Sequence, residues 1–246
     1  MKALGLLDEN TNELTNLARI ILEDKGFDPF LEDIGTIWLL HYSLVKNNYS
    51  SIYSLVFNEL RKERAVFSKK QLAAFIKRKY AENDDNSFNS NTIDKDISVF
   101  TRLYKRVDFQ TVNKDFEDEI SSLMIDLELL NSTIEEEIKE GTNKKEKVEW
   151  YYLHGKTRST LPAAILLFTI LDCFEGAKNI AFKRLEIESN SPGMIFLLSK
   201  DALFKQLKEL ENLFPGITLS ETAGNTVLVI PDEIDRWEIL QNYYAN

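Results

Sequence analysis

The segment WYYLHGKTRST, residues 150–160, combines aromatic rings, cations and hydroxyl groups just before an apolar helix. His154, Lys156 and Arg158 could bind an anion there, because the first N–H groups of a helix are unpaired and its dipole favours negative charge. Cations beside such a helix start could hold a phosphate or a sulfate. The alternative is an ordinary strand-to-helix linker with solvated side chains, in which His154 has no visible partner for acid–base catalysis.

A second set of residues suits contacts with phosphate rather than covalent chemistry. Residues 61–106 contain twelve basic and six acidic residues, a balance of +6 in a chain of formal net charge −10. The remaining chain therefore carries −16, and it would repel polyanions that do not meet this segment. The predicted DNA contacts are Lys69, Lys70, Lys77, Arg78, Lys95, Arg102, Lys105 and Arg106.

Two helices are expected to position these cations. Ser68 and Gln71 have the spacing of a capping box, which predicts that the first helix starts there. In the second, residues 91–106, an apolar stripe faces the core; its members are Ile93, Ile97, Phe100 and Tyr104. Lys95, Arg102 and Arg106 fall within about 40° of one another on the opposite face.

Helix, turn and helix with a basic outer face is the layout of a helix-turn-helix DNA reader. Asp94 and Asp96 dilute the charge of the second helix. The same pattern also fits helix faces that are merely solvated, or a face that docks another protein.

The rest of the chain predicts further helices and short strands. Residues 111–150 are acidic, and KVEWYYLH, residues 147–154, alternates as a strand that could be one arm of a hairpin wing or part of a connector. An apolar helix is expected from about Thr160, and a helix capped by Ser199 should end at Pro215-Gly216. Two strand-like runs follow within residues 217–230.

These elements predict a mainly α protein with small β-hairpins, of class α+β, built from two winged-helix-like modules. We expect a helix-turn-helix-like module at 1–110, an acidic connector with a possible wing strand at 111–150, and a second module at 151–246. In the second module acidic residues balance the lysines of the last helix, so it should bind a protein partner rather than DNA.

His41 lies in LEDIGTIWLLHYSLV, residues 31–45, which is apolar nearly all round. We expect Asp28 and Pro29 to be the N-cap and first residue of a helix here. Position 41 lies on the same stripe as Ile37 and Trp38, so His41 is expected to be a hydrogen-bonded core residue rather than a catalytic one.

The sequence contains none of the usual catalytic signatures. We find no Gly-rich phosphate loop, Walker motif, HExxH motif or dinucleotide fingerprint, and with one cysteine and two histidines no cysteine-based zinc site. We therefore expect no cofactor, no metal site and no enzymatic activity. The longest apolar run, residues 161–171, is about half of the ~20 residues that a membrane-spanning helix needs, so the cytoplasm is the expected location.

The stretch GFDPFLEDIGTIWLLHYSLV, residues 26–45, preceded by LGLLDENTNELTNLARIIL, carries a resemblance. It resembles an uncharacterised prokaryotic family, domain-of-unknown-function family 4007, and the likeness continues in outline along the whole chain. Members of that family are often encoded beside PAPS-reductase-like proteins in DNA-phosphorothioation and related phage-defence clusters, and often carry further residues before the segment that matches Met1. The resemblance implies no catalytic residues.

Together these features lead to the hypothesis of an accessory DNA-binding or adaptor protein of a bacterial DNA-modification or phage-defence system, whose partners are DNA and proteins of that system. Two alternatives stay open: a pure protein-interaction scaffold of the system and a transcriptional regulator of its gene cluster. A third alternative, an enzyme acting through residues 150–160, would depend on Lys156 and Arg158.

Overall fold

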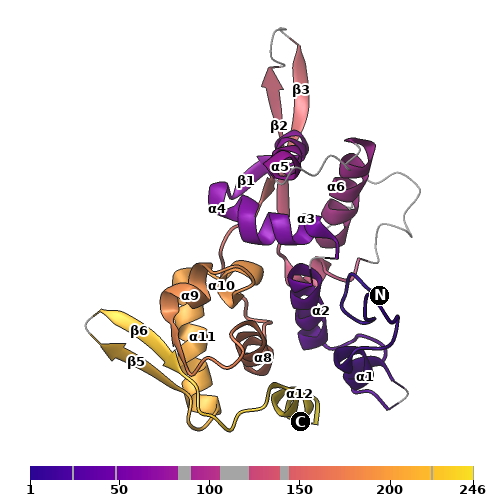
Figure 1. The fold of residues 1–246 in the computed structure, drawn as a ribbon. Coiled ribbons are helices and arrows are strands. Elements are labelled where there is room, and N and C mark those ends of the chain that lie inside the picture. Colours follow the sequence, from indigo (N-terminus) through magenta and orange to yellow (C-terminus); the bar gives the residue numbers. More distant parts are fainter. Residues whose placement is uncertain are drawn as a thin grey trace. The chain divides into compact units, whose positions relative to one another are not determined.

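Helices with two small antiparallel sheets make up the protein, which we describe from a computed structural model (Figure 1). The structure describes residues 1–23, 25–47, 49–82, 90–105, 122–138, 144–222 and 224–245. By their internal contacts the residues group into two units, which we call unit 1, Met1–Asn58 with Gly155–Asn246, and unit 2, Glu59–His154. The predicted class, α+β with a majority of helix, is confirmed.

The elements of unit 1 come from both ends of the chain. Its helices are α1 (Asn16–Leu22), α2 (Ile34–Lys46), α3 (Ser51–Ser54), α8 (Ala163–Cys173), α9 (Phe182–Ile187), α10 (Pro192–Ile195), α11 (Lys200–Leu213) and α12 (Arg236–Ala245). Its strands are β4 (Asn179–Ala181), β5 (Thr218–Thr222) and β6 (Asn225–Val229).

Unit 2 is smaller. Its helices are α4 (Arg61–Glu63), α5 (Lys69–Glu82), α6 (Ser90–Tyr104) and the short 3-10 helix η2 (Ile125–Leu127), and its strands are β1 (Val66–Ser68), β2 (Asn131–Ile138) and β3 (Lys145–Tyr152). A π-helix, η1 (Leu55–Leu60), contains the boundary between the two units.

Helix α2, which the sequence predicted to be apolar nearly all round, is largely buried in unit 1. Ten of its thirteen residues are buried, and Trp38 has no exposed surface. The Trp38 indole N–H donates to Thr160 Oγ1 at 3.3 Å, and its ring meets Phe196 edge to face at 5.5 Å between centroids. A helix that is apolar on all sides needs partners on all sides, and one of them is α8 from the C-terminal half.

The start of α2 differs from the prediction. Asp33, not Asp28, is the N-cap, and its Oδ1 accepts from the N–H groups of Gly35 and Thr36. The Asp28 carboxylate instead accepts from the N–H groups of Glu32 and Asp33. Asp28 therefore binds backbone donors ahead of the helix and Asp33 binds donors of its first turn, and the motif spacing alone did not separate a turn from a cap.

In unit 2 the predicted helices are present. Ser68 N–H donates to Gln71 Oε1 and Gln71 N–H donates to Ser68 Oγ, both at 3.3 Å, so the predicted capping box closes at the start of α5. Ile93, Ile97, Phe100 and Tyr104 of α6 are buried, as their spacing predicts. The strand expected at 147–154 is β3, one arm of a hairpin with β2, so the hairpin alternative is the one observed.

The two sheets have the same order of strands. In unit 2 the order is β1-β3-β2, and in unit 1 it is β4-β6-β5, with all pairings antiparallel. Helices lie between the first strand and the hairpin formed by the other two: α5, α6 and η2 in the described part of unit 2, and α9, α10 and α11 in unit 1 (Figure 1). Gly216, at φ +89°, follows α11 and allows the sharp turn into β5 that Pro215-Gly216 predicted.

The predicted segments 1–110, 111–150 and 151–246 divide the chain differently from the two units. Residues at both ends share one core because α2 and α8 pack on each other, and local sequence patterns do not encode such a long-range contact. None of the helices within the described ranges has both the length and the apolar composition needed to cross a bilayer.

Candidate nucleic-acid interface

Helix α5 presents most of its predicted cations to solvent. Lys69 and Lys70 are exposed in its first turn, and Lys77 is exposed further along. Within the part of the chain that the structure describes, these three lysines form no ion pair. They are therefore available to an external anion, and the first two lie where a helix start favours negative charge.

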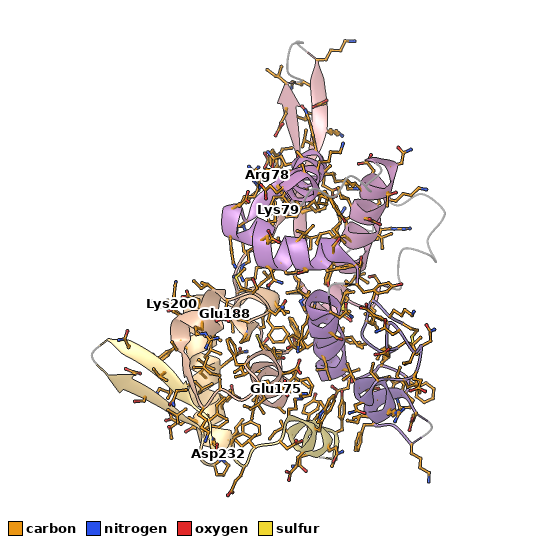
Figure 2. All side chains as sticks on the ribbon, viewed as in Figure 1. Arg78, Lys79, Glu175, Glu188, Lys200 and Asp232 are labelled. Atoms are coloured by element: carbon orange, nitrogen blue, oxygen red, sulfur yellow. The ribbon has the colours of Figure 1, made fainter. Side chains whose placement is uncertain are left out.

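Arg78 is engaged within unit 2. Its Nη2 donates to both carboxylate oxygens of Glu63 at 2.6 Å, and its Nε lies 3.7 Å from Glu82. The neighbouring Lys79 pairs with Glu59 at 2.8 Å (Figure 2). The Glu63 side chain raises the pKa of Arg78, and Arg78 in turn lowers the pKa of Glu63, as expected for an ion pair.

Helix α6 exposes Lys95 and Arg102 on the side opposite its buried stripe. Neither forms an ion pair among the described residues. Asp94 and Asp96 are exposed on the same helix, as the sequence indicated, and Val99 is 48% exposed. The outer side of α6 is thus mixed in charge. Lys95 and Arg102 are seven positions apart, which is about two helical turns.

Lys105, predicted as a DNA contact, forms an ion pair within unit 2. Lys105 is half-buried just after α6, where its Nζ lies 2.5 Å from Glu149 Oε1 on β3. Glu149 also accepts from Tyr151 Oη and, at 2.9 Å, from Ser132 Oγ. Lys105 is therefore bound inside unit 2, and Arg106 lies outside the described residues.

The hairpin of unit 2 adds a cation that the sequence analysis did not select. Lys147 is exposed on β3, and the strand register puts it on the same face as Lys145. Lys145 pairs with Glu136 at 3.1 Å, whereas Lys147 has no ion pair among the described residues. The period-2 alternation of a strand could have identified the pair from sequence.

The residues of the anion site predicted at residues 150–160 differ in their unit and in their exposure. His154 is the last residue of unit 2, whereas Lys156 and Arg158 belong to unit 1. Lys156 is exposed, but Arg158 is only 5% exposed and its Nε donates to the Phe196 carbonyl oxygen at 3.1 Å. Arg158 therefore bonds to buried backbone, and no local pattern distinguishes it from a solvated arginine.

Burial shifts the pKa of two further side chains with reactive atoms, His41 and Cys173. His41 is fully buried and donates from Nε2 to the Ile195 carbonyl oxygen at 3.0 Å, and burial lowers its pKa to about 3. Burial raises the pKa of the Cys173 thiol to about 11, so it is protonated at neutral pH. No cluster of three or more His, Cys, Asp or Glu residues suited to a metal ion occurs within the described ranges.

Comparison with known proteins gives a family and a fold. A family model described as "Protein of unknown function (DUF4007)" matches residues 1–244. No curated protein matches the chain.

Two similar solved structures are titled "Magnesium ion-bound SspB crystal structure" and "SspB crystal structure", with TM-scores of 0.78 and 0.77. Each is 22% identical and the alignment covers 100% of this chain and 73% of the other. A likeness at this identity concerns the fold alone.

Proposed function

The chain belongs to the DUF4007 family, as its residues 26–45 predicted, and we propose that it is an accessory DNA-binding protein of a bacterial DNA-modification or phage-defence system. The observation that supports this proposal is a set of exposed cations on α5 and α6 of unit 2 that no described acidic residue neutralises. Its members are Lys69, Lys70, Lys77, Lys95 and Arg102. We call this set the basic surface.

The order of elements in unit 2 agrees with a winged-helix-like reading. Among the described residues, the strand β1, the helices α5, α6 and η2 and the hairpin β2–β3 occur in this order, and β1 pairs with β3. In helix-turn-helix proteins the second helix of the pair enters the major groove, a role that α6 would take with Lys95 and Arg102. The hairpin β2–β3 would be the wing, with Lys147 as a further phosphate contact.

Unit 1 has the same order of strands but a different balance of charge. Its corresponding helix, α11, carries Lys200, Lys205 and Lys208, of which Lys208 is paired with Glu211 at 3.2 Å. Asp201 and Glu209 are exposed on the same helix. We assign this unit to the binding of a partner protein of the system, because a mixed face of this kind gains little from releasing phosphate counterions.

Fluorescence anisotropy with a labelled duplex at low salt tests DNA binding. The double substitution Lys95→Glu, Arg102→Glu should weaken binding by at least tenfold, because it replaces two attractive contacts with repulsive ones. The matched control, Lys200→Glu, Lys205→Glu on α11, makes the same change in net charge and should leave affinity within about twofold.

Two outcomes would contradict the proposal. One is no detectable binding of the wild-type protein to duplex DNA at low salt. The other is an equal loss of affinity in both double variants, which would mean that net charge rather than the basic surface governs binding. Circular dichroism of each variant shows whether the fold is kept.

An accessory role also means that the protein does not cut DNA by itself. One of the similar structures is titled as magnesium ion-bound, so the binding reactions should be repeated with Mg²⁺ and the DNA then run on a denaturing gel. We expect intact strands. Nicked or cleaved DNA that depends on Mg²⁺ would make the protein an enzyme and replace this part of the proposal.

A protein-interaction scaffold is the second candidate function, and the exposed aliphatic residues of the hairpin favour it. Ile134 is 62% exposed and Ile138 is 70% exposed, and they lie on one face of β2. If this face docks a partner, Ile134→Ser with Ile138→Ser should abolish co-purification with proteins encoded beside the gene, while DNA affinity stays unchanged. Loss of DNA affinity with co-purification intact would assign the face to DNA instead.

A further inference from the structure

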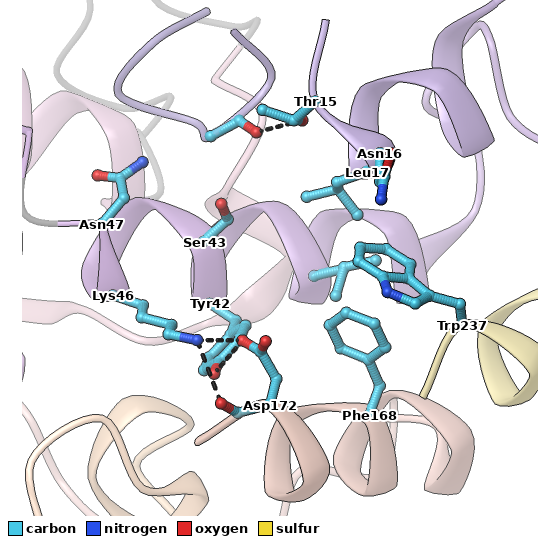
Figure 3. A pocket seen from close by; sticks show the side chains of 12 residues that line it. Thr15, Asn16, Leu17, Tyr42, Ser43, Lys46, Asn47, Phe168, Asp172 and Trp237 are labelled. Atoms are coloured by element: carbon cyan, nitrogen blue, oxygen red, sulfur yellow. Dashed lines mark hydrogen bonds and ion pairs between the residues drawn. The ribbon is translucent and has the colours of Figure 1, made fainter. Parts of the chain in front are cut away.

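A pocket opens in unit 1, and none of the residues that line it belongs to the basic surface. It has a volume of about 440 Å³, within the range of small-molecule sites. Its walls come from α1, α2, α8, α12 and the loop ahead of α1, so five parts of the chain meet there (Figure 3). The loop approaches α2 closely at Gly5, where an added Cβ would lie 2.0 Å from Ser43 Oγ.

One end of the pocket is apolar and aromatic. Leu17, Leu39, Phe168 and Trp237 line it, and the rings of Phe168 and Trp237 meet edge to face with centroids 5.4 Å apart. Leu17, Leu39 and Phe168 are at most 8% exposed, so this end is a firm surface rather than a set of mobile side chains. Such a surface favours a flat, apolar group.

The other end is polar, and its one carboxylate is already saturated. Asp172 Oδ2 accepts from Tyr42 Oη at 2.7 Å and from Lys46 Nζ, and its Oδ1 lies 3.0 Å from Arg236 Nη1. Burial, and then the neighbouring Asp172, raise the pKa of Tyr42, so its hydroxyl stays protonated and keeps donating. Asp172 therefore offers little to a ligand that donates hydrogen bonds or carries positive charge.

Donors, by contrast, are left over at this site. The Lys46 ammonium group donates one hydrogen bond to the carboxylate of Asp172 and one to its backbone carbonyl oxygen. An ammonium group has three N–H donors, so one is left for a ligand. Neither the Ser43 hydroxyl nor the Trp237 indole N–H has a hydrogen-bond partner within the ranges that the structure describes. Lys46 and Arg236 both meet the half-buried Asp172, and Arg236 also lies 3.5 Å from Glu175, so the surplus at this site is one of hydrogen-bond donors.

From this arrangement we infer that the pocket binds a small molecule with a flat apolar body and one acidic group, a carboxylate or a phosphate. The ring would lie against Phe168 and Trp237, and the acid would accept from Lys46. This site is independent of the proposed DNA binding, because none of its residues belongs to unit 2.

Three probes with the same ring and different charge test the inference: 2-naphthoate, 2-naphthamide and 2-naphthylmethylammonium. In isothermal titration of the full chain, 2-naphthoate should bind with saturation, and at least tenfold more tightly than the cation, with the amide between them. Equal binding of the three probes would overturn the assignment of an acidic group.

Substitutions then locate the binding. Lys46→Met keeps the length of the side chain and removes the charge. It should weaken the binding of 2-naphthoate by at least tenfold and change the affinity for 2-naphthamide by less than about threefold. The matched control is Lys183→Met on α9, an exposed lysine outside the pocket, which should change neither.

Asn16→Trp provides a test that leaves the core intact. Asn16 is exposed at the rim of the pocket, so a large ring there should block all three probes. Its control, Asn212→Trp, adds the same ring to the exposed side of α11 and should leave binding unchanged. No saturable binding of 2-naphthoate to the wild-type protein, or equal binding to the Asn16→Trp variant, would overturn the pocket itself. DNA affinity should not change in any of these variants.

Discussion

His41 illustrates how burial decides what a side chain can do. Its ring lies edge to face with Phe57 at 4.8 Å between centroids, and a carbonyl oxygen can only accept, so the nitrogen bonded to Ile195 must carry a proton. Burial disfavours the charged ring and lowers its pKa to about 3. His41 therefore stays neutral in the folded protein at physiological pH and acts as a structural donor.

This lowered pKa makes stability depend on pH. As pH falls, the unfolded chain binds a proton on His41 near pH 6.5, while the folded protein does so only near pH 3. The contribution of His41 to the free energy of unfolding is fully present above pH 6.5 and is lost as the pH falls towards 3. Urea unfolding should show a loss of about 2 kcal/mol from this group between pH 7 and pH 5.

The control for this prediction is His41→Gln, whose amide nitrogen can occupy the place of Nε2 without titrating. Between pH 7 and pH 5 the free energy of unfolding of the variant should fall by about 2 kcal/mol less than that of the wild-type protein. Equal pH dependence in both proteins would show that His41 is accessible to protons in the folded state.

At the scale of single elements, reciprocal hydrogen bonds set where α5 begins. Ser68 is 8% exposed and shares its capping box with Gln71. Because two backbone N–H groups depend on this pair, Ser68→Ala should lower the free energy of unfolding by about 1 kcal/mol. Ser68→Asp, which keeps an acceptor, should recover most of it in urea titrations, and no difference between the two variants would contradict a capping role.

The end of α6 is tied to the hairpin by Glu149. Burial opposes ionisation of this carboxylate, but the hydrogen bonds from Lys105, Tyr151 and Ser132 outweigh it and lower its pKa. Lys105 is thus needed within unit 2, although its sequence position suggested a DNA contact.

A double-mutant cycle of Lys105→Met and Glu149→Gln tests this role. Both side chains are about a quarter to a third exposed, so we expect a coupling energy of no more than about 1 kcal/mol in the free energy of unfolding. DNA affinity should fall less in Lys105→Met than in Arg102→Met, since only Arg102 is unpaired among the described residues. The opposite order would return Lys105 to the DNA-contacting set.

At the scale of the whole molecule, charge is distributed unevenly. The chain has a formal net charge of −10, yet residues 61–106 carry +6. Binding of a polyanion should therefore depend on a few contacts and be strongly sensitive to salt.

That sensitivity is measurable as the slope of log affinity against log salt concentration. Each phosphate contact contributes about −0.9, so Lys95→Gln with Arg102→Gln should make the slope shallower by roughly 1.8. Anisotropy titrations at several salt concentrations measure it, with Lys200→Gln, Lys205→Gln as the matched control. An unchanged slope would mean that α6 does not touch phosphate.

Much of the fold followed from local pattern. Apolar periodicity located α5 and α6, start and stop signals located α11, and Ser68–Gln71 predicted a cap that is present. Two strand-like runs located the hairpin β5–β6, whereas for β3 the sequence left a hairpin arm and a connector as alternatives. The residues 26–45 identified the family. Where two similar short-range signals competed, as for Asp28 and Asp33 before α2, spacing selected the wrong cap.

By itself the sequence determined several of the longer helices, the strand β3 and the hairpin β5–β6, the family and the position of the basic segment, because these depend on residue types a few positions apart. Only the tertiary structure decided which cations stay available. Arg78 meets Glu63, Lys105 meets Glu149 and Arg158 is buried against Phe196. The partners of these three cations lie 15, 44 and 38 positions away in the chain. Asp172, the partner of Lys46 in the pocket, lies 126 positions from it. Such pairings arise from how helices and strands pack in space, and no periodicity along the chain records them.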